Sequence, residues 1–243
     1  ICGDCLEVMK ELPDGCVDLV LCDLPYGTTA CKWDTVIPFE PLWAQYRRIA
    51  KKNAAIVLTA SQPFTTALIA SNMREFRYCW VWRKSRATGF QNANRMPMKE
   101  HEDVAVFYRV LPTYNPQGVV PFGRINKRGS VGENWGGDGS LVNEYSQKLT
   151  NYPRSVLDIP VAGSTVHPTQ KPVELMEYLI KTYTNDGEVV LDNCMGSGTT
   201  AVACKETGRH YIGIEIEPKY CDIARRRVAE ATPSLFAKEA VTI

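Results

Sequence analysis

The chain has 243 residues, of which 44% are hydrophobic and 23% are charged, and its formal net charge is +1. These values are ordinary for a folded globular domain and exclude a collagen-like or intrinsically disordered chain. No run of about 18 apolar residues occurs, so a membrane-spanning helix is excluded. Nine cysteines, an odd number, form a poor disulfide framework, and we therefore expect a cytoplasmic protein with reduced thiols. Cys2 and Cys5 form the only Cys-x-x-Cys pair, and without a second pair of ligands we expect no metal site.

The near-neutral net charge hides an uneven distribution. Residues 77–154 contain 12 lysines and arginines against 6 aspartates and glutamates, a net charge of +6. A basic region of this kind favours a polyanionic partner. On charge alone, however, a solvated loop face explains it equally well.

Alternating strands and helices are predicted for the first part of the chain. The apolar run Val17–Asp23 indicates a buried strand that ends on an acidic residue before a proline turn. Hydrophobic periodicity then predicts a helix over 40–52, a strand over 54–59, a helix over 63–72, and strands over 78–82 and 104–108.

This pattern ends between residues 111 and 160. Seven of the 17 glycines lie between Gly118 and Gly139. A loop of this length inside a compact domain is usually functional or disordered. We therefore expect 110–160 to be a glycine-rich insertion without regular secondary structure, within a single domain that spans 1–243.

The last part of the chain returns to alternation. Apolar residues at helical spacing predict a helix from Pro172, which suits the first helical position. A strand over 188–192, a glycine-rich turn, a helix over 199–207, a strand over 210–216 and a helix from about 219 are expected next. The arginines at 225–227 are expected to face solvent. This order predicts an α/β fold, with a mostly parallel sheet covered by helices on both faces.

The glycine-rich turn indicates a nucleoside-binding site. Gly196-Ser197-Gly198-Thr199-Thr200 follows a strand that ends at Asp192, and Glu215 lies 19 residues after Gly196. Glycines let the backbone approach a ligand closely, and an acid at this spacing accepts hydrogen bonds from ribose hydroxyls. An adenosine-containing cofactor is therefore expected. The turn alone leaves two classes open, dinucleotides such as NAD and S-adenosylmethionine.

The tetrapeptide Asp23-Leu24-Pro25-Tyr26 favours the second class. At the end of a buried strand, the Asp23 carboxylate and the Leu24 carbonyl group can each accept one hydrogen of a planar amine, which leaves the nitrogen lone pair available for attack. Pro25 biases Leu24 towards an extended backbone, and Tyr26 can stack on the base that carries the amine. An ordinary proline turn after a strand is the alternative for the tetrapeptide taken by itself.

Three motifs in this order resemble one known family. They are Asp23-Leu24-Pro25-Tyr26, His167-Pro168-Thr169-Gln170-Lys171-Pro172 and the turn from Gly196 to Thr200. Together they are similar to the β-class amino-DNA methyltransferases, over roughly residues 3–228. The resemblance implies a Rossmann-like class I methyltransferase sheet with a circularly permuted motif order, in which 110–160 is the inserted target-recognition region.

The resemblance also implies roles for individual residues. S-adenosylmethionine is the implied cofactor, with Asp4 and Cys5 at its adenine and Glu215 at its ribose. Its methionine end would be held by the residues of the second and third motifs: Thr169, Lys171, Gly196, Ser197, Gly198, Thr199 and Thr200. Asp192, at the end of the strand before the turn, is a further candidate for binding the cofactor. The tetrapeptide Asp23, Leu24, Pro25 and Tyr26 would be catalytic.

Two positions depart from the family pattern. The family usually has Asp-Pro-Pro-Tyr and Asp-Pro-Phe, whereas this chain has Leu24 and Asn193-Cys194. Leu24 changes little, because its carbonyl group is the part that the reaction uses. Cys194 removes an aromatic surface beside the cofactor, and we therefore expect weaker binding of S-adenosylmethionine.

Duplex DNA is the implied substrate, with a target base flipped out of the stack. Adenine N6 is favoured because the resemblance associates an Asp-led tetrapeptide with adenine. Cytosine N4, an RNA or protein amide, and an NAD-dependent oxidoreductase are the alternatives. Whether the chain forms a homodimer stays open. Basic side chains of the central region are the candidates for contacts with DNA: Arg83, Lys84, Arg86, Arg95, Arg124, Lys127 and Arg128.

Overall fold

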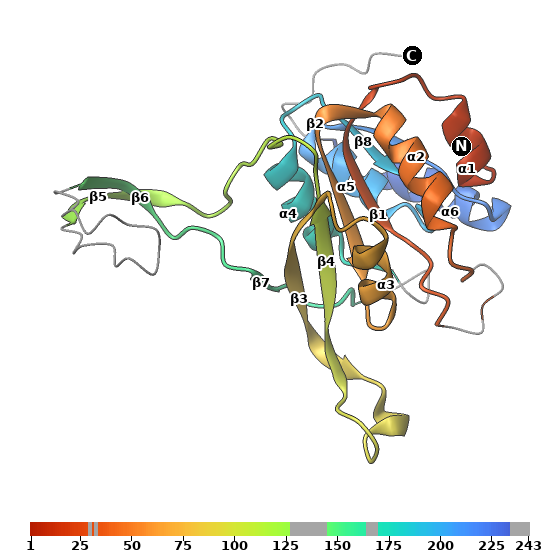
Figure 1. The fold of residues 1–243 in the computed structure, drawn as a ribbon, viewed down its shortest axis with the longest axis horizontal. Coiled ribbons are helices and arrows are strands. Elements are labelled where there is room, and N and C mark those ends of the chain that lie inside the picture. Colours follow the sequence, from red (N-terminus) through yellow and green to blue (C-terminus); the bar gives the residue numbers. More distant parts are fainter. Residues whose placement is uncertain (29–30, 32–33, 127–144, 164–169, 234–243) are drawn as a thin grey trace. The chain divides into compact units, whose positions relative to one another are not determined.

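The computed structural model describes residues 1–28, 31, 34–126, 145–163 and 170–233. The chain forms two compact units, one made of Ile1–Asn115 with Ser155–Ile243 and the other of Pro116–Arg154. In the smaller unit, β5 (Val120–Asn126) pairs with β6 (Tyr145–Thr150) in an antiparallel ribbon (Figure 1).

The larger unit contains one seven-stranded sheet. In spatial order its strands are β7 (Val156–Asp158), β3 (Phe76–Thr88), β4 (Lys99–Phe107), β2 (Ala50–Ala60), β1 (Val17–Asp23), β8 (Val189–Asp192) and β9 (His210–Gly213). Only β4 runs antiparallel to its neighbours, β2 and β3. The expected mostly parallel sheet is therefore confirmed.

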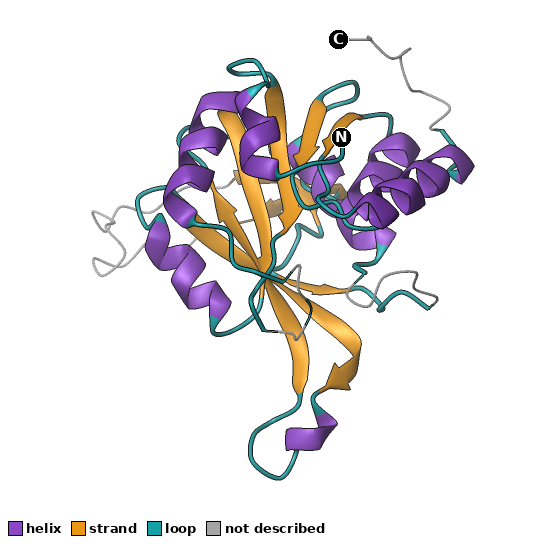
Figure 2. Ribbon diagram, turned by 90° about the vertical axis from the view of Figure 1, so that its right-hand side faces the viewer, coloured by secondary structure: helices purple, strands orange, loops and turns teal. Residues whose placement is uncertain are grey.

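Helices cover both faces of this sheet, as expected (Figure 2). In chain order they are α1 (Cys5–Lys10), α2 (Phe39–Ile49), α3 (Phe64–Ser71), α4 (Val173–Tyr183), α5 (Thr199–Thr207) and α6 (Pro218–Glu230), with a short 3-10 helix, η1, at Phe90–Asn92.

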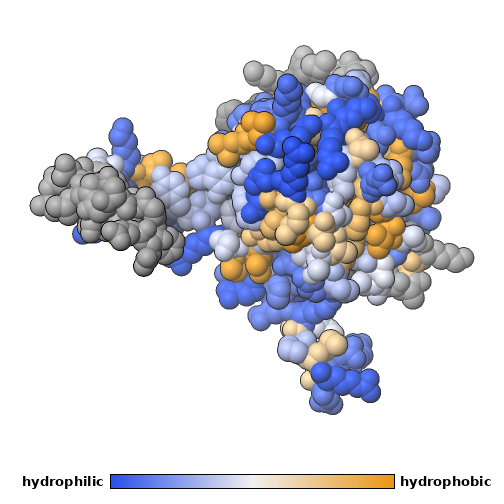
Figure 3. Space-filling model, viewed as in Figure 1, coloured by the Kyte–Doolittle hydropathy of each residue, from blue (hydrophilic) through white to orange (hydrophobic). Residues whose placement is uncertain are grey.

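A long hairpin formed by β3 and β4 extends past the rest of the sheet (Figures 1 and 2). The two strands pair antiparallel from Phe76 opposite Phe107 to Thr88 opposite Lys99. The helix η1 lies in the turn between them. Hydrophilic and hydrophobic residues lie side by side at the end of this hairpin (Figure 3).

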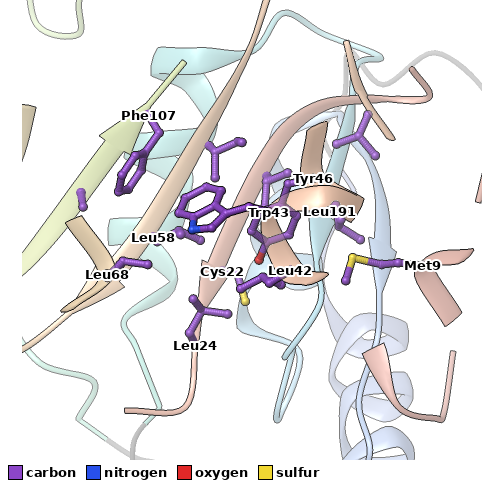
Figure 4. Close-up of a cluster of buried hydrophobic side chains, with 14 of the residues drawn as sticks. Met9, Cys22, Leu24, Leu42, Trp43, Tyr46, Leu58, Leu68, Phe107 and Leu191 are labelled. Carbon is purple, nitrogen blue, oxygen red and sulfur yellow. The ribbon is translucent and has the colours of Figure 1, made fainter. Parts of the chain in front are cut away.

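Two hydrophobic clusters explain why helices pack on both faces. Side chains of β1 alternate between them: Val20 and Cys22 belong to the cluster under α1, α2 and α3, whereas Leu19 and Leu21 belong to the cluster under α4 and α5. Figure 4 shows the first cluster, with the Trp43 and Tyr46 rings of α2 against the sheet. Alternate strand residues point to opposite faces, so a strand buried on both sides reads as a continuous apolar run, here Leu19–Cys22.

Several predicted element boundaries are wrong by a few residues. Strands β2, β3 and β4 begin at Ala50, Phe76 and Lys99 rather than at 54, 78 and 104, and β3 ends at Thr88 rather than at 82. Helix α2 ends at Ile49 rather than at 52, because β2 begins at Ala50 without a loop. Pro172 is the N-cap of α4 and not its first helical residue. Strand β9 ends at Gly213, after which Glu215 forms an isolated parallel bridge with Cys2.

The expected structureless stretch over 111–160 is also wrong. It contains β5, β6 and β7. β5 and β6 pair with each other, whereas β7 joins the edge of the main sheet beside β3. Each of these strands is stabilised by a partner distant in the sequence, which local composition does not reveal.

None of the helices in the described part of the chain is long and apolar enough to cross a membrane.

Candidate active site

One cavity of about 930 Å³ lies in the larger unit, where β1 and β8 end. Asp23 closes β1 and Asp192 closes β8, and these strands pair in parallel, so both acids reach the same edge of the sheet. The carboxyl edge of a parallel sheet is the usual place for a ligand. Residues of all three sequence motifs line the cavity, including Asp23, Tyr26, Lys171 and Gly196, and Glu215 lines it as well.

The Asp23 carboxylate is held by three neighbouring side chains. The Tyr26 hydroxyl donates to its Oδ1 atom at 2.8 Å, and the Thr59 hydroxyl donates to the same oxygen. Lys171 Nζ donates to Oδ2 at 2.7 Å. Thr59 comes from β2, directly opposite Asp23 in the parallel pairing of β1 and β2. The carboxylate therefore has a fixed orientation at the cavity wall.

Lys171 belongs to a row of four buried or half-buried charges. Its ammonium group lies 2.7 Å from Asp23 Oδ2 and 3.2 Å from Glu102 Oε2. The other oxygen of Glu102 lies 2.6 Å from Lys84 Nζ. The Lys171 side chain is 6% exposed and that of Glu102 is 13% exposed. Burying these charges is costly, and their alternating signs offset that cost.

The pKa shifts of this row follow from the pairing. Burial by itself lowers the pKa of Lys171, but attraction to Asp23 and Glu102 outweighs burial and raises the pKa. Burial likewise raises the pKa of Glu102, and the neighbouring Lys171 and Lys84 outweigh it, so the net pKa is lowered. Both residues are therefore charged at neutral pH.

The Tyr26 ring is fixed by aromatic packing. It stacks on Phe64 of α3 with the ring centroids 5.1 Å apart. Lys171 Nζ lies 5.5 Å from the centroid of the same ring. The loop after Tyr26 is held by Asp34, whose carboxylate accepts hydrogen bonds from the backbone N–H groups of Gly27 and Thr28, each at 2.9 Å.

Asp192 is buried at the start of the glycine-rich turn. Its carboxylate accepts hydrogen bonds from the Thr200 hydroxyl at 2.6 Å and from the Cys194 N–H at 3.1 Å. Burial raises the pKa of Asp192 to about 6, although both hydrogen bonds act to lower it. Asp192 lines the cavity, so its charge is available to a ligand there.

Glu215 joins the glycine-rich turn to the N-terminal segment. Its Oε2 atom accepts a hydrogen bond from the Gly196 N–H at 2.8 Å, and its backbone oxygen accepts one from the Gly3 N–H at 2.8 Å. Burial raises the pKa of Glu215. Asp4 follows Gly3 and caps α1 by accepting from the Leu6 N–H at 2.8 Å. Residues from the two ends of the sequence therefore meet at one side of the cavity.

Most of the residues predicted to bind the cofactor line the cavity, but not all of them do. Asp4, Cys5, Lys171, Asp192, Gly196, Ser197, Thr199, Thr200 and Glu215 line the cavity. Gly198 is absent from that lining and packs against α6, where an added Cβ would lie 2.8 Å from the Ala224 Cβ. His167, Pro168 and Thr169 lie outside the described residues.

Cys194 lies beside two other thiols. Side-chain hydrogen bonding with Cys194 lowers the pKa of Cys5, and hydrogen bonding with Cys22 and Cys5 raises the pKa of Cys194. The neighbouring Asn193 is buried and accepts a hydrogen bond from the Tyr46 hydroxyl at 2.6 Å. The expected effect of Cys194 on cofactor affinity stays a prediction.

The basic residues predicted to contact DNA lie in different places: some are paired with acidic residues, some lie at the cavity or on the β3–β4 hairpin, and the others lie in the smaller unit or outside the described residues. Lys84 lies in the cavity beside Glu102, and Arg83 pairs with Asp158 at 2.5 Å. Arg86 lines the cavity and Arg95 follows η1 in the β3–β4 hairpin. Arg124 is in β5 of the smaller unit, whereas Lys127 and Arg128 lie outside the described residues.

Several residues of the site are missed by sequence reasoning. Glu102 and Thr59 enter the site only through strand pairing, and neither has a recognisable motif. Arg227 is expected in solvent, but this is wrong, because its guanidinium donates to the Ser197 backbone oxygen at 2.7 Å and to the Ser197 hydroxyl at 2.8 Å. Arg227 thereby ties α6 to the turn.

Two curated proteins are similar to this chain over most of its length. The Type II methyltransferase M.HpaI of Haemophilus parainfluenzae is 26% identical over 245 residues, which cover 94% of this chain and 73% of that protein. The Type II methyltransferase M.HinfI of Haemophilus influenzae is 26% identical over 265 residues, covering 96% of this chain and 68% of that protein.

Solved structures show the same fold. The crystal structure of the M1.HpyAVI–SAM complex matches with a TM-score of 0.65 and 25% identity, covering 93% of this chain and 98% of that one. The PvuII DNA methyltransferase (cytosine-N4-specific) matches with a TM-score of 0.67, covering 99% of this chain and 86% of that one, and at 15% identity it supports the fold alone.

A family model described as DNA methylase matches residues 17–226. This match includes the Asp23 tetrapeptide, the Lys171 segment and the glycine-rich turn, and it covers most of the chain. The chain therefore belongs to the DNA methylase family, as the resemblance to the β-class amino-DNA methyltransferases predicts.

Proposed function

We propose that this DNA methyltransferase transfers the methyl group of S-adenosylmethionine to the exocyclic amine of a base flipped out of duplex DNA, with adenine N6 as the preferred acceptor. One observation carries the proposal. The Asp23 carboxylate and the Tyr26 ring line the same cavity as the glycine-rich turn and Glu215. The proposed amine acceptor site and the proposed nucleoside site therefore share one cavity.

The cavity fits S-adenosylmethionine in its size and in its chemical groups. Its volume of about 930 Å³ is in the range of small-molecule sites. Asp192 and Glu215 supply acceptors for an ammonium group and for ribose hydroxyls. The backbone N–H groups at the start of α5 offer donors for a carboxylate. When bound, the cofactor supplies a methyl group that its sulfonium already activates.

Asp23 and Leu24 orient the attacking amine in the proposed reaction. The carboxylate accepts one amino hydrogen and the Leu24 carbonyl oxygen accepts the other, so the nitrogen lone pair points out of the base plane. The Leu24 side chain is 4% exposed and packs in the core beside Cys22, which anchors this backbone position (Figure 4). In the proposed reaction, the Asp23 carboxylate that accepts this hydrogen bond also takes the proton that the amine releases after transfer.

Lys171 positions the Asp23 carboxylate through the 2.7 Å ion pair. Glu102 holds the other side of the lysine, and Lys84 holds Glu102. Because this row of charges is already in place, the Asp23 carboxylate needs little rearrangement when the amine of the base binds. No cysteine acts as a nucleophile in this reaction.

Tyr26 provides the surface for the flipped base. Its ring is fixed by Phe64, and a rigid aromatic ring stacks on any base regardless of identity. A base inside a duplex cannot reach the cavity, so flipping is required. Arg86 and Arg95 are proposed to contact the flanking phosphates, whereas Lys84 is proposed to act inside the cavity through Glu102.

The preference for adenine rests on the Asp-led tetrapeptide, which the family resemblance associates with adenine N6. Cytosine N4 is the alternative within the same chemistry, because both bases present an amine beside a ring nitrogen. Membership of the DNA methylase family gives no support to an NAD-dependent oxidoreductase.

The direct test is to incubate the protein with S-adenosylmethionine and unmethylated plasmid DNA, digest the DNA to nucleosides and quantify methylated bases by mass spectrometry. We expect N6-methyladenine. N4-methylcytosine would keep the reaction and overturn the base preference. No methylated base, with S-adenosylmethionine binding measured in the same preparation, would contradict the proposal and direct the search to RNA or protein amides.

A further inference from the structure

The arm formed by residues 85–99 of the β3–β4 hairpin has an unusual composition. Every residue of this arm is exposed. It carries Arg86, Arg95 and Lys99 and contains no acidic residue. Among the described residues, neither Arg86 nor Arg95 forms an ion pair. The arm is therefore a surface for a polyanion.

The base of the arm is part of the active-site cavity. Arg86, Ala87, Thr88 and Lys99 line the same cavity as Asp23 and Tyr26. Lys99 Nζ donates to the Gln62 backbone oxygen at 3.2 Å, which ties the arm to the segment before α3. The arm therefore borders the cavity along this wall.

The tip of the arm presents an aromatic ring to solvent. Thr88 and Lys99 are the last residues paired in the sheet, and Gly89 then turns the chain with a φ of 90°. Phe90 follows at the start of η1 and is 77% exposed, the highest fraction among the large hydrophobic residues described. Met96 in the same tip is 55% exposed.

An apolar ring on a basic arm matches a specific need of base flipping. Removing a base from the duplex leaves a gap in the stack and loses stacking and pairing energy. Proteins that open the stack insert apolar side chains such as Phe or Met into it, while basic side chains hold the phosphates. Phe90 lies between Arg86 and Arg95 in the sequence, just beyond a strand pair whose last residues, Thr88 and Lys99, line the cavity.

We propose that Phe90 enters the base stack of duplex DNA at the position that the target base leaves. Phe90 thereby acts as a positioning residue for methyl transfer, and the flanking Arg86 and Arg95 hold the backbone on either side. This inference rests on the proposed function, since it requires a flipped base in the cavity.

The test compares Phe90→Ala, Phe90→Trp and the control Met73→Ala with the unmodified protein. Met73 is 65% exposed and lies outside the arm and outside the cavity lining. Sequencing of plasmid DNA methylated by the unmodified protein first defines a target site. Two short duplexes with that site are then compared, one with the target base paired and one with the target base opposite an abasic position. The readouts are kcat/KM for methyl transfer and the binding constant for S-adenosylmethionine.

We expect Phe90→Ala to lower kcat/KM on the paired duplex by about tenfold or more and to change it far less on the abasic duplex, where the base is already free to leave the stack. Phe90→Trp should restore most of the activity, because indole also stacks. Met73→Ala and the binding of S-adenosylmethionine should be unchanged.

Two results would overturn the inference. One is full activity of Phe90→Ala on the paired duplex. The other is an equal loss on both duplexes, which assigns the ring to general DNA or protein contacts. If the unmodified protein methylates no DNA at all, the proposed function fails, and this inference fails with it for that separate reason.

Discussion

Lys171 Nζ lies 2.7 Å from Asp23 Oδ2, which joins two motifs that are 148 residues apart in the sequence. The sequence resemblance implies that Lys171 faces the methionine end of the cofactor. The structure places its ammonium group between Asp23 and Glu102, at the cavity wall. The lysine is therefore a partner of the Asp23 carboxylate, and its role at the cofactor stays a proposal.

Replacing Lys171 with Met should destabilise the fold. The change leaves Asp23 and Glu102 without their shared cation in a poorly hydrated wall, and breaking a buried pair from one side costs about 3 kcal/mol or more. Urea unfolding measures this loss. Lys181→Met is the matched control, since the Lys181 side chain is 42% exposed and pairs with Glu177 on the same helix. This variant should change stability by about 0.5 kcal/mol or less. Equal losses of unfolding free energy in the two variants would contradict the conclusion that the buried row of charges stabilises the fold.

Glu102→Gln should change how stability depends on pH. The pKa of Glu102 is lowered below its ordinary value of 4.5, so its ionised form stabilises the folded state above that pH, and the contribution disappears as the pH falls through the lower folded-state value. The unmodified protein should exceed Glu102→Gln in unfolding free energy at neutral pH, and the gap should shrink below pH 4.5. Glu100→Gln, an exposed change on the same strand, should leave the unfolding free energy equal to that of the unmodified protein at both pH values. If the difference in unfolding free energy between the unmodified protein and Glu102→Gln did not change with pH, the ionised form of Glu102 would not be what stabilises the fold.

Binding of S-adenosylmethionine should strengthen with rising pH because of Asp192. Burial raises the pKa of Asp192 to about 6, so the carboxylate is largely protonated at pH 5 and ionised at pH 7. Only the ionised form attracts the cofactor ammonium group, and we expect affinity to rise by about tenfold over that range. Calorimetric titration of Asp192→Asn should give a flatter curve. Glu215 is present in both proteins, so the difference between the curves isolates Asp192, and superimposable curves would rule this role out.

The parts of the fold that the sequence predicts are those with a local signal. The strand at Val17–Asp23 contains the apolar run Leu19–Cys22, and the helix over Thr199–Thr207 begins directly after a glycine turn, so both are correct to the residue. The strands β5 and β6 have no such signal, because each is completed only by the other.

The residues of the candidate site also differ in whether the local sequence reveals them. Asp23, Tyr26, Asp192 and Glu215 are recognisable because each ends a strand or follows one. Glu102 is not, since it lies on β4 opposite Trp82 and reaches Lys171 only after the sheet has formed. Its burial beside two lysines depends on long-range packing that no spacing in the sequence encodes.

The measurement that most directly tests the central claim is methyl transfer to plasmid DNA by Asp23→Ala, with S-adenosylmethionine binding measured on the same sample. The account predicts that transfer falls by about 100-fold or more, because the amine loses its orienting carboxylate, while cofactor affinity stays close to that of the unmodified protein. Near-normal transfer by Asp23→Ala would contradict the account, since the carboxylate at the end of β1 would then have no part in the reaction.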